Sequence, residues 1–410
     1  MKSYAFILGS HPILSYAEII NLLRVEGISF RELSYNSEFT ILEIEKFKET
    51  SFQKKLGGTI RIVEIKEELK TIFQAEEVLT EKRLFDDFLA KKEGKILLGV
   101  TAYTSSEFGY AERNALKRLG VLLKESLKAK HSIRYLSCPS FNLPSIVVSD
   151  LITKGAEIAL LKDGQRVFLG KTVAVQDIRG YKERDFDRPQ KDLLAGVLPP
   201  KLAQMIINLT RSRETKGVFD PFCGSGGILQ EACLLGLEVF GSDWDRNVLK
   251  KAEENIRWSA EVMNKKAPAD LARRLRQADA REIKWAKVNK KGIVVVTEPY
   301  LGPPQRRRLL SAQAENLMKE LKKLYVGFFK NLARNFPQIG RVGIVLPVAK
   351  TTSGLVFLEI LDELTKLGYK RKAVLPSEIL KRDPGITKRQ GFLYSRPDQF
   401  ILREIFVFER

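Results

Sequence analysis

Residues 218–255 have the sequence VFDPFCGSGGILQEACLLGLEVFGSDWDRNVLKKAEEN. The pattern predicts, in order, an apolar strand at 218–219, a glycine-rich turn at 220–227, a helix at 228–235 with apolar residues at helical spacing, and a second strand at 237–242 that ends in Asp243. Such a unit of strand, glycine turn, helix and strand is typical of α/β sheets that bind nucleosides.

The glycine turn favours one class of nucleoside ligand. Gly224 and Gly226 have no Cβ, so a ligand can approach their backbone and the amides at the start of the helix. The dinucleotide fingerprint needs a Gly or Ala where Leu229 stands, which argues against nicotinamide cofactors. Asp220 can accept a hydrogen bond from an α-amino group, and Asp243 is placed to bind ribose hydroxyls. We therefore expect S-adenosylmethionine rather than a pyrophosphate.

Composition indicates the class of partner. The chain has 410 residues, enough for two or three domains, and its 70 Lys and Arg against 50 Asp and Glu give a net charge of +20. Such an excess predicts a polyanionic partner. No apolar run approaches the roughly eighteen residues of a membrane-spanning helix, and residues 1–10 lack the features of a signal peptide. We expect a cytoplasmic protein that binds nucleic acid and no membrane.

The sequence gives no reason to expect a metal ion. Its cysteines and histidines are far from any metal-ligand spacing: Cys138, Cys223, Cys233, His11 and His131. Cys223 lies inside the glycine turn, where a small residue that fits is a better interpretation than a nucleophile. We expect no metal site and no catalysis by histidine.

The rest of the chain predicts further α/β structure. Residues 1–70 suggest a ferredoxin-like domain, and residues 71–175 a second α/β region with a long basic helix at 109–129. That helix can be a solvated face or a phosphate-binding surface, and the overall charge favours the second. A charged segment at 176–195 is predicted to be a linker, and residues 196–410 a doubly wound, Rossmann-like domain with an antiparallel edge.

Acidic residues are predicted to meet at one edge of this last sheet, because ligands of doubly wound sheets lie beyond the carboxyl ends of the strands. Asp279 follows the third strand, where it could hold the adenine amine, and Glu298 follows the strand at 292–297. A carboxylate and a proline-held carbonyl could bind the N–H groups of a nucleobase amine, while Tyr300 stacks on the base. A helix is predicted farther along, at 355–367.

The chain resembles the tRNA guanosine-10 N2-methyltransferases of archaea and eukaryotes, which join a THUMP RNA-binding region to a Rossmann-like methyltransferase. The segments that carry this resemblance are Leu56–Ile60, Gly170–Asp177, Arg184–Pro189, Gly196–Ala203, Asp220–Gly227 and Tyr394–Asp398. The resemblance implies that residues 71–175 are a THUMP domain, that the N-terminal regions grip tRNA, and that S-adenosylmethionine supplies the methyl group for a guanosine N2 amine. It leaves open the number of methyl groups and the need for a small activating partner subunit.

The sequence departs from the family at its catalytic motif. The family has Asp-Pro-Pro-Tyr-Gly, whereas residues 298–302 here are Glu-Pro-Tyr-Leu-Gly. The carboxylate is therefore one methylene longer, and leucine stands at the family's tyrosine position. An active methyltransferase is the favoured interpretation. The alternatives are a tRNA-binding relative with impaired catalysis, or a methyltransferase acting on ribosomal RNA or on another nucleobase amine.

Together these arguments define the residues expected to be functional. The catalytic residues expected are Glu298, Pro299 and Tyr300. The cofactor-binding residues expected are Pro200, Asp220, Phe222, Gly224, Gly226, Asp243, Trp244, Asp279 and Ala280. The RNA-binding residues expected are Arg113, Lys117, Arg306 and Arg307.

Overall fold

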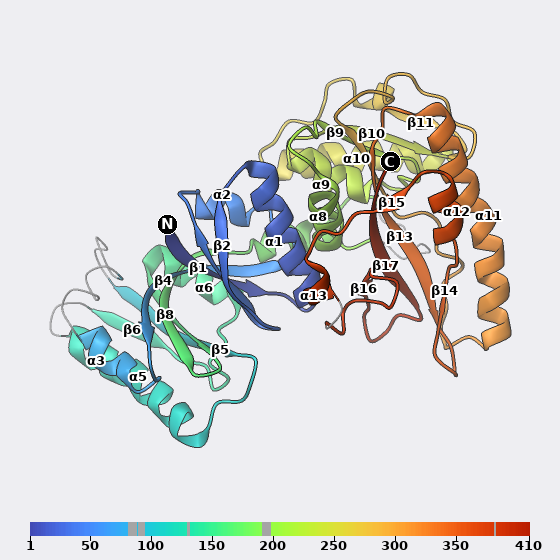
Figure 1. Cartoon of the computed structure of the whole chain (residues 1–410). Helices are drawn as coiled ribbons and strands as arrows, with labels where there is room; N and C mark the ends of the chain where they lie inside the picture. Colours follow the sequence, from blue (N-terminus) through green and yellow to red (C-terminus); the bar gives the residue numbers. More distant parts are fainter. Residues whose placement is uncertain (81–87, 89–94, 129–131, 191–197, 381–382) are drawn as a thin grey trace. The chain divides into compact units, whose positions relative to one another are not determined.

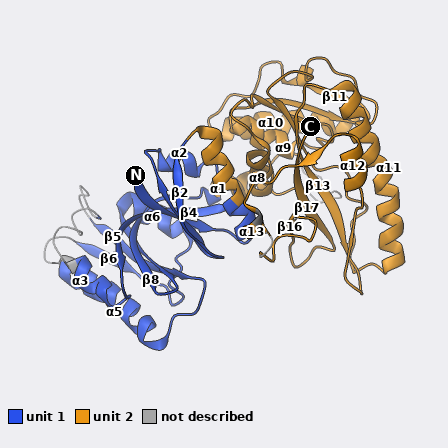
Figure 2. Cartoon of the chain, in the orientation of Figure 1, with its two compact units in different colours: residues 1–16, 28–178 blue, residues 17–27, 179–410 orange. Residues whose placement is uncertain are grey.

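The computed structural model describes residues 1–80, 88, 95–128, 132–190, 198–380 and 383–410. It divides into two compact units (Figures 1 and 2). Unit 1 comprises Met1–Tyr16 and Ile28–Ile178, and unit 2 comprises Ala17–Gly27 and Arg179–Arg410. Helix α1 (Pro12–Glu26) therefore begins in unit 1 and continues in unit 2.

Unit 1 is built on an eight-stranded sheet. Its strands lie in the order β2 (Phe30–Tyr35), β3 (Phe39–Ile44), β1 (Lys2–Leu8), β4 (Thr59–Leu69), β8 (Arg166–Val175), β7 (Gly155–Asp163), β5 (Ile96–Thr104) and β6 (Ile133–Leu136). Neighbours are antiparallel, except that β5 runs parallel to both β6 and β7. The helices described in this unit besides α1 are α2 (Glu49–Gln53), α3 (Gln74–Thr80), α5 (Tyr110–Lys128) and α6 (Ser145–Lys154).

A buried ion pair crosses this sheet from β4 to β7. Nη1 of Arg61 lies 2.6 Å from Oε1 of Glu157, and the guanidinium also donates to the Tyr103 hydroxyl and the Leu143 carbonyl. Buried charges need such partners, because desolvation costs several kcal/mol, roughly, for each unpaired ion. The sheet and this ion pair join residues 1–70 to residues 71–175, whose division into two domains stays a prediction.

Unit 2 is a doubly wound α/β domain with a nine-stranded sheet, as the sequence predicted. The main order is β11 (Leu275–Gln277), β10 (Glu238–Asp243), β9 (Gly217–Asp220), β12 (Ile293–Thr297), β13 (Arg341–Lys350), β17 (Ile401–Glu409) and β15 (Lys370–Arg371). The strands from β11 to β13 are parallel, whereas β17 and β15 form the antiparallel edge. Strand β14 (Leu355–Phe357) pairs with β13, and β16 (Phe392–Tyr394) pairs with β17.

Helices join these strands and cover the sheet (Figure 1). They are α8 (Pro200–Thr210), α9 (Gly227–Leu234), α10 (Arg246–Val262), the 3-10 turn η2 (Leu271–Arg274), α11 (Ser311–Asn335), α12 (Leu361–Lys366) and α13 (Ser377–Leu380). The long helix α11 buries Phe328 and Phe329 in one core with Phe219 of β9 and Ile344 of β13. This core fixes the strand ends that carry the candidate site.

The helix predicted at 355–367 is wrong in its first half. Leu355, Val356 and Phe357 form β14, which pairs with Val348–Lys350 of β13, and helix α12 begins only at Leu361. A short apolar run has no periodicity that separates a strand from a buried helix, so pairing with β13 decides its structure.

The charged segment predicted to be a linker contains helical structure. Helix α7 (Ile178–Lys182) runs into the π-helical turn η1 (Glu183–Asp187), where Arg184 is buried. Nε of Arg184 lies 2.7 Å from Oε1 of Glu231 in α9, and Nη2 lies 3.3 Å from Oε2. Residues 191–195 of the predicted linker, and Gly196 and Val197 at the predicted start of the next domain, lie outside the described residues. The linker and its limits stay a prediction.

A buried polar contact holds the end of α1 against α8 within unit 2. Nδ2 of Asn208 donates to Oε1 of Glu18 at 2.8 Å, and Nδ2 of Asn21 donates to the Asn208 carbonyl at 2.6 Å. Glu18 and Asn208 are both inaccessible to solvent. The carboxyl of Glu18 therefore depends on protein donors in place of water.

We expect Asn208→Ala to lower the free energy of unfolding by about 1–3 kcal/mol, because Glu18 then loses a buried donor. Urea denaturation measures this change. Asn247→Ala on the exposed side of α10 is the control and should change the free energy by less than about 0.5 kcal/mol. Equal effects of the two substitutions would show that the buried contact contributes little.

Candidate active site

The candidate site lies at the point where the strand order of the unit 2 sheet reverses. From β9 the chain proceeds outward through β10 to β11, and it then returns to place β12 on the other side of β9. Doubly wound sheets bind ligands at such a point, in a crevice beyond the carboxyl ends of the strands, so we expect the crevice of this domain at the ends of β9 and β12. Asp220 and Asp243 end β9 and β10, and Glu298 follows β12 directly.

The glycine turn connects β9 to α9 in the predicted place. Gly224 and Gly226 have φ angles of 47° and 89°, which L side chains rarely adopt, and Gly226 is the N-cap of α9. A Cβ on Gly224 would meet nothing within 4 Å, whereas one on Gly226 would lie 3.1 Å from Cβ of Ala252. The turn thus packs on α10 at Gly226 and leaves space at Gly224 for a ligand.

Gly226→Ala should destabilise the protein by about 1–2 kcal/mol through its left-handed backbone, and it should also weaken binding of S-adenosylmethionine by shifting the turn. Gly236→Ala is the matched control, because Gly236 has a φ of 79° and a Cβ added there would meet no atom within 4 Å. Urea denaturation and calorimetry measure the two effects. Equal loss of cofactor affinity in both variants would contradict a role of the turn in binding.

Asp220 is a buried carboxyl with two donors on one oxygen. Oδ1 accepts from Thr297 Oγ1 at 2.6 Å and from the Phe222 amide at 3.1 Å. Burial raises the pKa of Asp220 to about 7, more than these donors lower it, and Asp243 and Glu298 raise it further. A ligand cation at this position would relieve the cost of the buried charge. The α-amino group of an amino-acid-bearing nucleoside fits this requirement.

Asp243 closes the other side of the turn. Its Oδ2 accepts from the Gly224 amide at 2.9 Å, and its Oδ1 accepts from the Asp245 amide at 3.1 Å. Burial raises the pKa of Asp243, although these backbone donors act in the opposite direction. The ring of the next residue, Trp244, is 76% exposed. The carboxylate is therefore fixed at the strand end, with an exposed aromatic ring beside it.

Asp279 and Ala280 follow β11 and differ in their surroundings. Asp279 is half-buried, and Nη2 of Arg281 lies 2.5 Å from its Oδ2, a pairing that lowers the pKa of Asp279. Ala280 is buried, and its carbonyl accepts from Nδ2 of Asn331 at 3.0 Å. Asp279 is already engaged by a neighbouring cation, a partner that the sequence analysis did not foresee.

Glu298 forms a two-bond ion pair with Arg403 of β17. Nε of Arg403 donates to Oε2 at 2.6 Å and Nη2 donates to Oε1 at 3.1 Å, and the two side chains are only 3% and 11% exposed, arginine first. Burial raises the pKa of Glu298, and the guanidinium opposes that rise. Pro299 is buried, whereas Tyr300 is 57% exposed and its carbonyl accepts from the Tyr325 hydroxyl at 3.3 Å.

Sequence reasoning missed two residues of this site, Thr297 and Arg403. Thr297 is the last residue of the predicted strand at 292–297. Its contact with Asp220 depends on the pairing of β12 with β9, which the local sequence does not reveal. Arg403 had a signal, because it interrupts the apolar strand from Ile401 to Phe408. A charge inside such a strand indicates a buried partner.

The remaining predicted residues are distributed over both units. Pro200 is buried at the first position of α8, and Phe222 packs on Phe328 with ring centroids 5.3 Å apart. Arg306 and Arg307 are exposed in the segment between β12 and α11. Arg113 and Lys117 are exposed on α5 in unit 1. The structure thus brings Asp220, Asp243 and Glu298 to the ends of neighbouring strands, and the roles of all these residues stay predictions.

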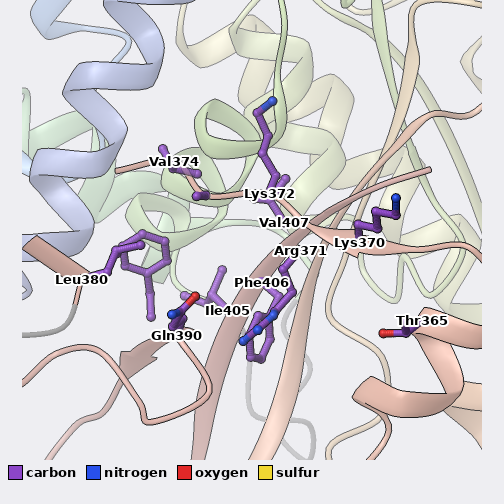
Figure 3. Close-up of a pocket in the computed structure, with 12 residues that line it drawn as sticks. Thr365, Lys370, Arg371, Lys372, Val374, Leu380, Gln390, Ile405, Phe406 and Val407 are labelled. Carbon is purple, nitrogen blue, oxygen red and sulfur yellow. The ribbon is translucent and has the colours of Figure 1, made fainter. Parts of the chain in front are cut away.

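A second hollow of about 300 Å³ lies elsewhere in unit 2 (Figure 3). It is lined by residues of β15, β16 and β17 and by residues outside these strands, among them Lys372 directly after β15, whose Nζ lies 2.5 Å from Oε1 of Glu409. Its residues Ile405–Val407 lie opposite Gly343–Val345 of β13, whereas Arg403 lies opposite Pro347, nearer the carboxyl end of that strand. This hollow therefore lies nearer the amino end of β13 than Arg403 does.

Across the described part of the chain, no group of three or more His, Cys, Asp and Glu side chains is arranged to hold a metal ion. Within the same residues, no helix has both the length and the apolar character that crossing a membrane requires.

Known proteins resemble this chain in sequence and in fold. Residues 188–356 match the family described as "RMKL-like, methyltransferase domain". A tRNA (guanine(10)-N2)-dimethyltransferase of Methanothermobacter thermautotrophicus is 24% identical over 359 residues, which cover 85% of this chain and 89% of the relative. A protein of the same name from Pyrococcus abyssi is 28% identical over 231 residues, covering 51% of this chain and 66% of the relative.

The solved structure of TrmN from Thermus thermophilus has the same fold, with a TM-score of 0.54 at 19% identity, covering 100% of this chain and 99% of that one. The fold, together with this family match, indicates that unit 2 contains a Rossmann-like methyltransferase domain.

Proposed function

We propose that the chain is an S-adenosylmethionine-dependent methyltransferase that modifies the N2 amine of guanosine 10 in tRNA. The observation that carries this proposal is the convergence of Asp220, Asp243 and Glu298 at the carboxyl ends of three neighbouring strands. The relatives named tRNA (guanine(10)-N2)-dimethyltransferase support the substrate, since one of them aligns with 85% of the chain.

The cofactor is held by residues of the glycine turn and the adjoining strand ends. When bound, S-adenosylmethionine supplies a methyl group activated by its positively charged sulfur. Asp220 accepts from its α-amino group, and Asp243 accepts from the ribose hydroxyls. The other residues assigned to the cofactor are Pro200, Phe222, Gly224, Gly226, Trp244, Asp279 and Ala280.

The acceptor base is held by residues 298–300. The Glu298 carboxylate accepts hydrogen bonds from the N–H groups of guanine, and the exposed ring of Tyr300 stacks on the base. Pro299 holds the backbone between them. The additional methylene of Glu298, relative to the aspartate of the family motif, extends the carboxylate to the guanidinium of Arg403. Because the Glu298 carboxylate is paired with Arg403, we favour an active methyltransferase over a relative with impaired catalysis.

The RNA is bound by positive charge. The chain has a net charge of +20, and Arg113, Lys117, Arg306 and Arg307 are exposed. Contacts to phosphates position an RNA without selecting its sequence, so these side chains orient the substrate and the crevice selects the base. We place this reaction in the cytoplasm. The methylation assay also shows whether one or two methyl groups are transferred and whether a small activating partner subunit is required.

The test is methylation of an unmodified tRNA transcript by the purified chain with labelled S-adenosylmethionine, followed by nucleoside mass spectrometry. We expect N2-methylguanosine or N2,N2-dimethylguanosine, which disappears when guanosine 10 is replaced by adenosine. Repeating the assay with added cell extract detects a required partner subunit. Binding of cofactor and tRNA without any methylated nucleoside, in both assays, would contradict the proposal and indicate a tRNA-binding relative.

A further inference from the structure

The ion pair between Glu298 and Arg403 joins two parts of the chain that are far apart in sequence. Glu298 follows the parallel strand β12, and Arg403 lies in the antiparallel strand β17, two strands away across β13. The arginine reaches the carboxylate with two nitrogens, Nε and Nη2, one to each oxygen. Such a two-bond contact fixes the plane of the carboxylate as well as its position.

The groups that surround this pair are mostly acidic or neutral. Asp220 of β9 lies near enough to Glu298 for the charge of Glu298 to raise the pKa of Asp220. Tyr325 of α11 faces Glu298, and Tyr394 of β16 faces Arg403. Among the described residues that act on the charge of Glu298, Arg403 is the cation. Without it, burial would favour the protonated carboxyl.

A carboxylate in this state has a defined hydrogen-bonding capacity. Its two oxygens offer about four acceptor positions, and Arg403 takes one on each oxygen. Guanine presents two adjacent donors, N1–H and N2–H, on its Watson–Crick edge. A charged carboxylate held in one plane can accept both, whereas a protonated carboxyl carries a hydrogen that opposes one of them.

We propose that Arg403 is a positioning residue that determines base specificity, because it holds Glu298 as a charged double acceptor for the N1–H and N2–H groups of guanine. This inference rests on the proposed function, since it assigns the substrate base to the same crevice. Adenine and other bases with an acceptor at N1 are rejected, because a lone pair then faces the carboxylate.

The first experiment measures the pH dependence of tRNA methylation by the unchanged chain, Arg403→Met and Arg403→Lys. In Arg403→Met the pKa of Glu298 rises, so activity should be lost at neutral pH, by about a hundredfold, and should recover as the pH increases. Arg403→Lys retains a cation but cannot form the two-bond contact. The pH at which its activity falls on acidification should therefore stay near that of the unchanged chain, while kcat falls. An identical pH profile in all three proteins would overturn the proposal.

The matched control is Arg184→Met. Arg184 forms an equally buried two-bond pair with Glu231, with distances of 2.7 and 3.3 Å, away from residues 298–300. Its loss should lower the melting temperature as much as Arg403→Met does, without moving the pH profile. A similar shift of the profile in Arg184→Met would show that the effect comes from loss of stability.

The second experiment tests base specificity with tRNA that carries 2-aminopurine in place of guanosine 10. This base keeps the amine but has an acceptor at N1. The unchanged chain should methylate it at least about tenfold more slowly than guanosine, whereas Arg403→Met at neutral pH should lose most of this preference, since a protonated carboxyl can donate to N1. Equal rates on both bases for the unchanged chain would overturn the proposal.

A third measurement does not depend on activity. The carboxyl signal of Glu298 in isotope-labelled protein, assigned by its absence in Glu298→Gln, is followed by NMR as the pH changes. Its midpoint should move to higher pH in Arg403→Met and stay nearly constant in Arg184→Met. An unmoved midpoint would overturn the role of Arg403, whereas absence of methylation by the unchanged chain would overturn the proposed function alone.

If Arg403→Met does not fold, Arg403→Lys is compared in the same way, and an unchanged rate and base preference would overturn the proposal.

Discussion

Glu298→Gln should reduce methylation of tRNA by about a hundredfold or more, while cofactor affinity changes by no more than about twofold. The amide has one acceptor oxygen in place of two, and its NH₂ group opposes the donors of guanine. Asp220 and Asp243, the residues proposed to bind the cofactor, lie at other strand ends, so the substitution should not displace them. Single-turnover methylation and calorimetry measure the two quantities.

The substitution also leaves Arg403 buried without its counter-charge, which costs stability by about 3 kcal/mol. Glu231→Gln is the matched control, because Glu231 pairs with the buried Arg184 through the same two-bond geometry. Both variants should lose similar stability in urea, but Glu231→Gln should keep most of its activity. Normal turnover by Glu298→Gln would remove Glu298 from the reaction.

Asp220→Asn should weaken binding of S-adenosylmethionine by about thirtyfold or more, because the charged acceptor for the α-amino group is lost. The same substitution should stabilise the protein above neutral pH. The pKa of Asp220 in the folded protein is about 7 against a usual value of 3.8, so the folded state disfavours the ionised carboxyl. Stability therefore falls as the pH rises between these two values and stays reduced above them, and asparagine removes this loss.

The pH dependence of cofactor affinity separates these two effects. In the unchanged chain, affinity should fall as the pH drops through about 7, because protonation of Asp220 removes the charge that binds the ammonium group. Asp220→Asn should bind weakly over the whole range, with a melting temperature higher than that of the unchanged chain at alkaline pH. A constant affinity of the unchanged chain over this range would contradict the assignment of Asp220.

Local sequence was sufficient for the part of the site that local geometry determines. The turn at 220–227 needs positive φ angles at Gly224 and Gly226, so its glycines, the following helix and the flanking strands could be recognised together. The doubly wound class of the unit 2 sheet, with its antiparallel edge, followed from alternating strands and helices. The same reasoning placed Asp220, Asp243 and Glu298 at strand ends, where the structure has them.

Contacts between distant segments could not be predicted in this way. Arg403 follows Glu298 by 105 positions, and no local pattern states that β17 lies two strands from β12. The short strand β14 was predicted to be helical because its pairing with β13 is likewise not local. Similarly, Arg281 engages Asp279 through a contact that depends on the turn after β11.

The measurement that tests the account most directly compares two tRNA transcripts, one with guanosine and one with inosine at position 10, in single-turnover reactions with the unchanged chain and with Glu298→Gln. Inosine keeps N1–H but has no 2-amino group. We predict N2-methylguanosine from the guanosine transcript and the unchanged chain, about a hundredfold less or lower still from that transcript and Glu298→Gln, and none from the inosine transcript. Equal methylation of the inosine transcript, or full activity of Glu298→Gln, would contradict the transfer of a methyl group to a guanosine amine held by Glu298.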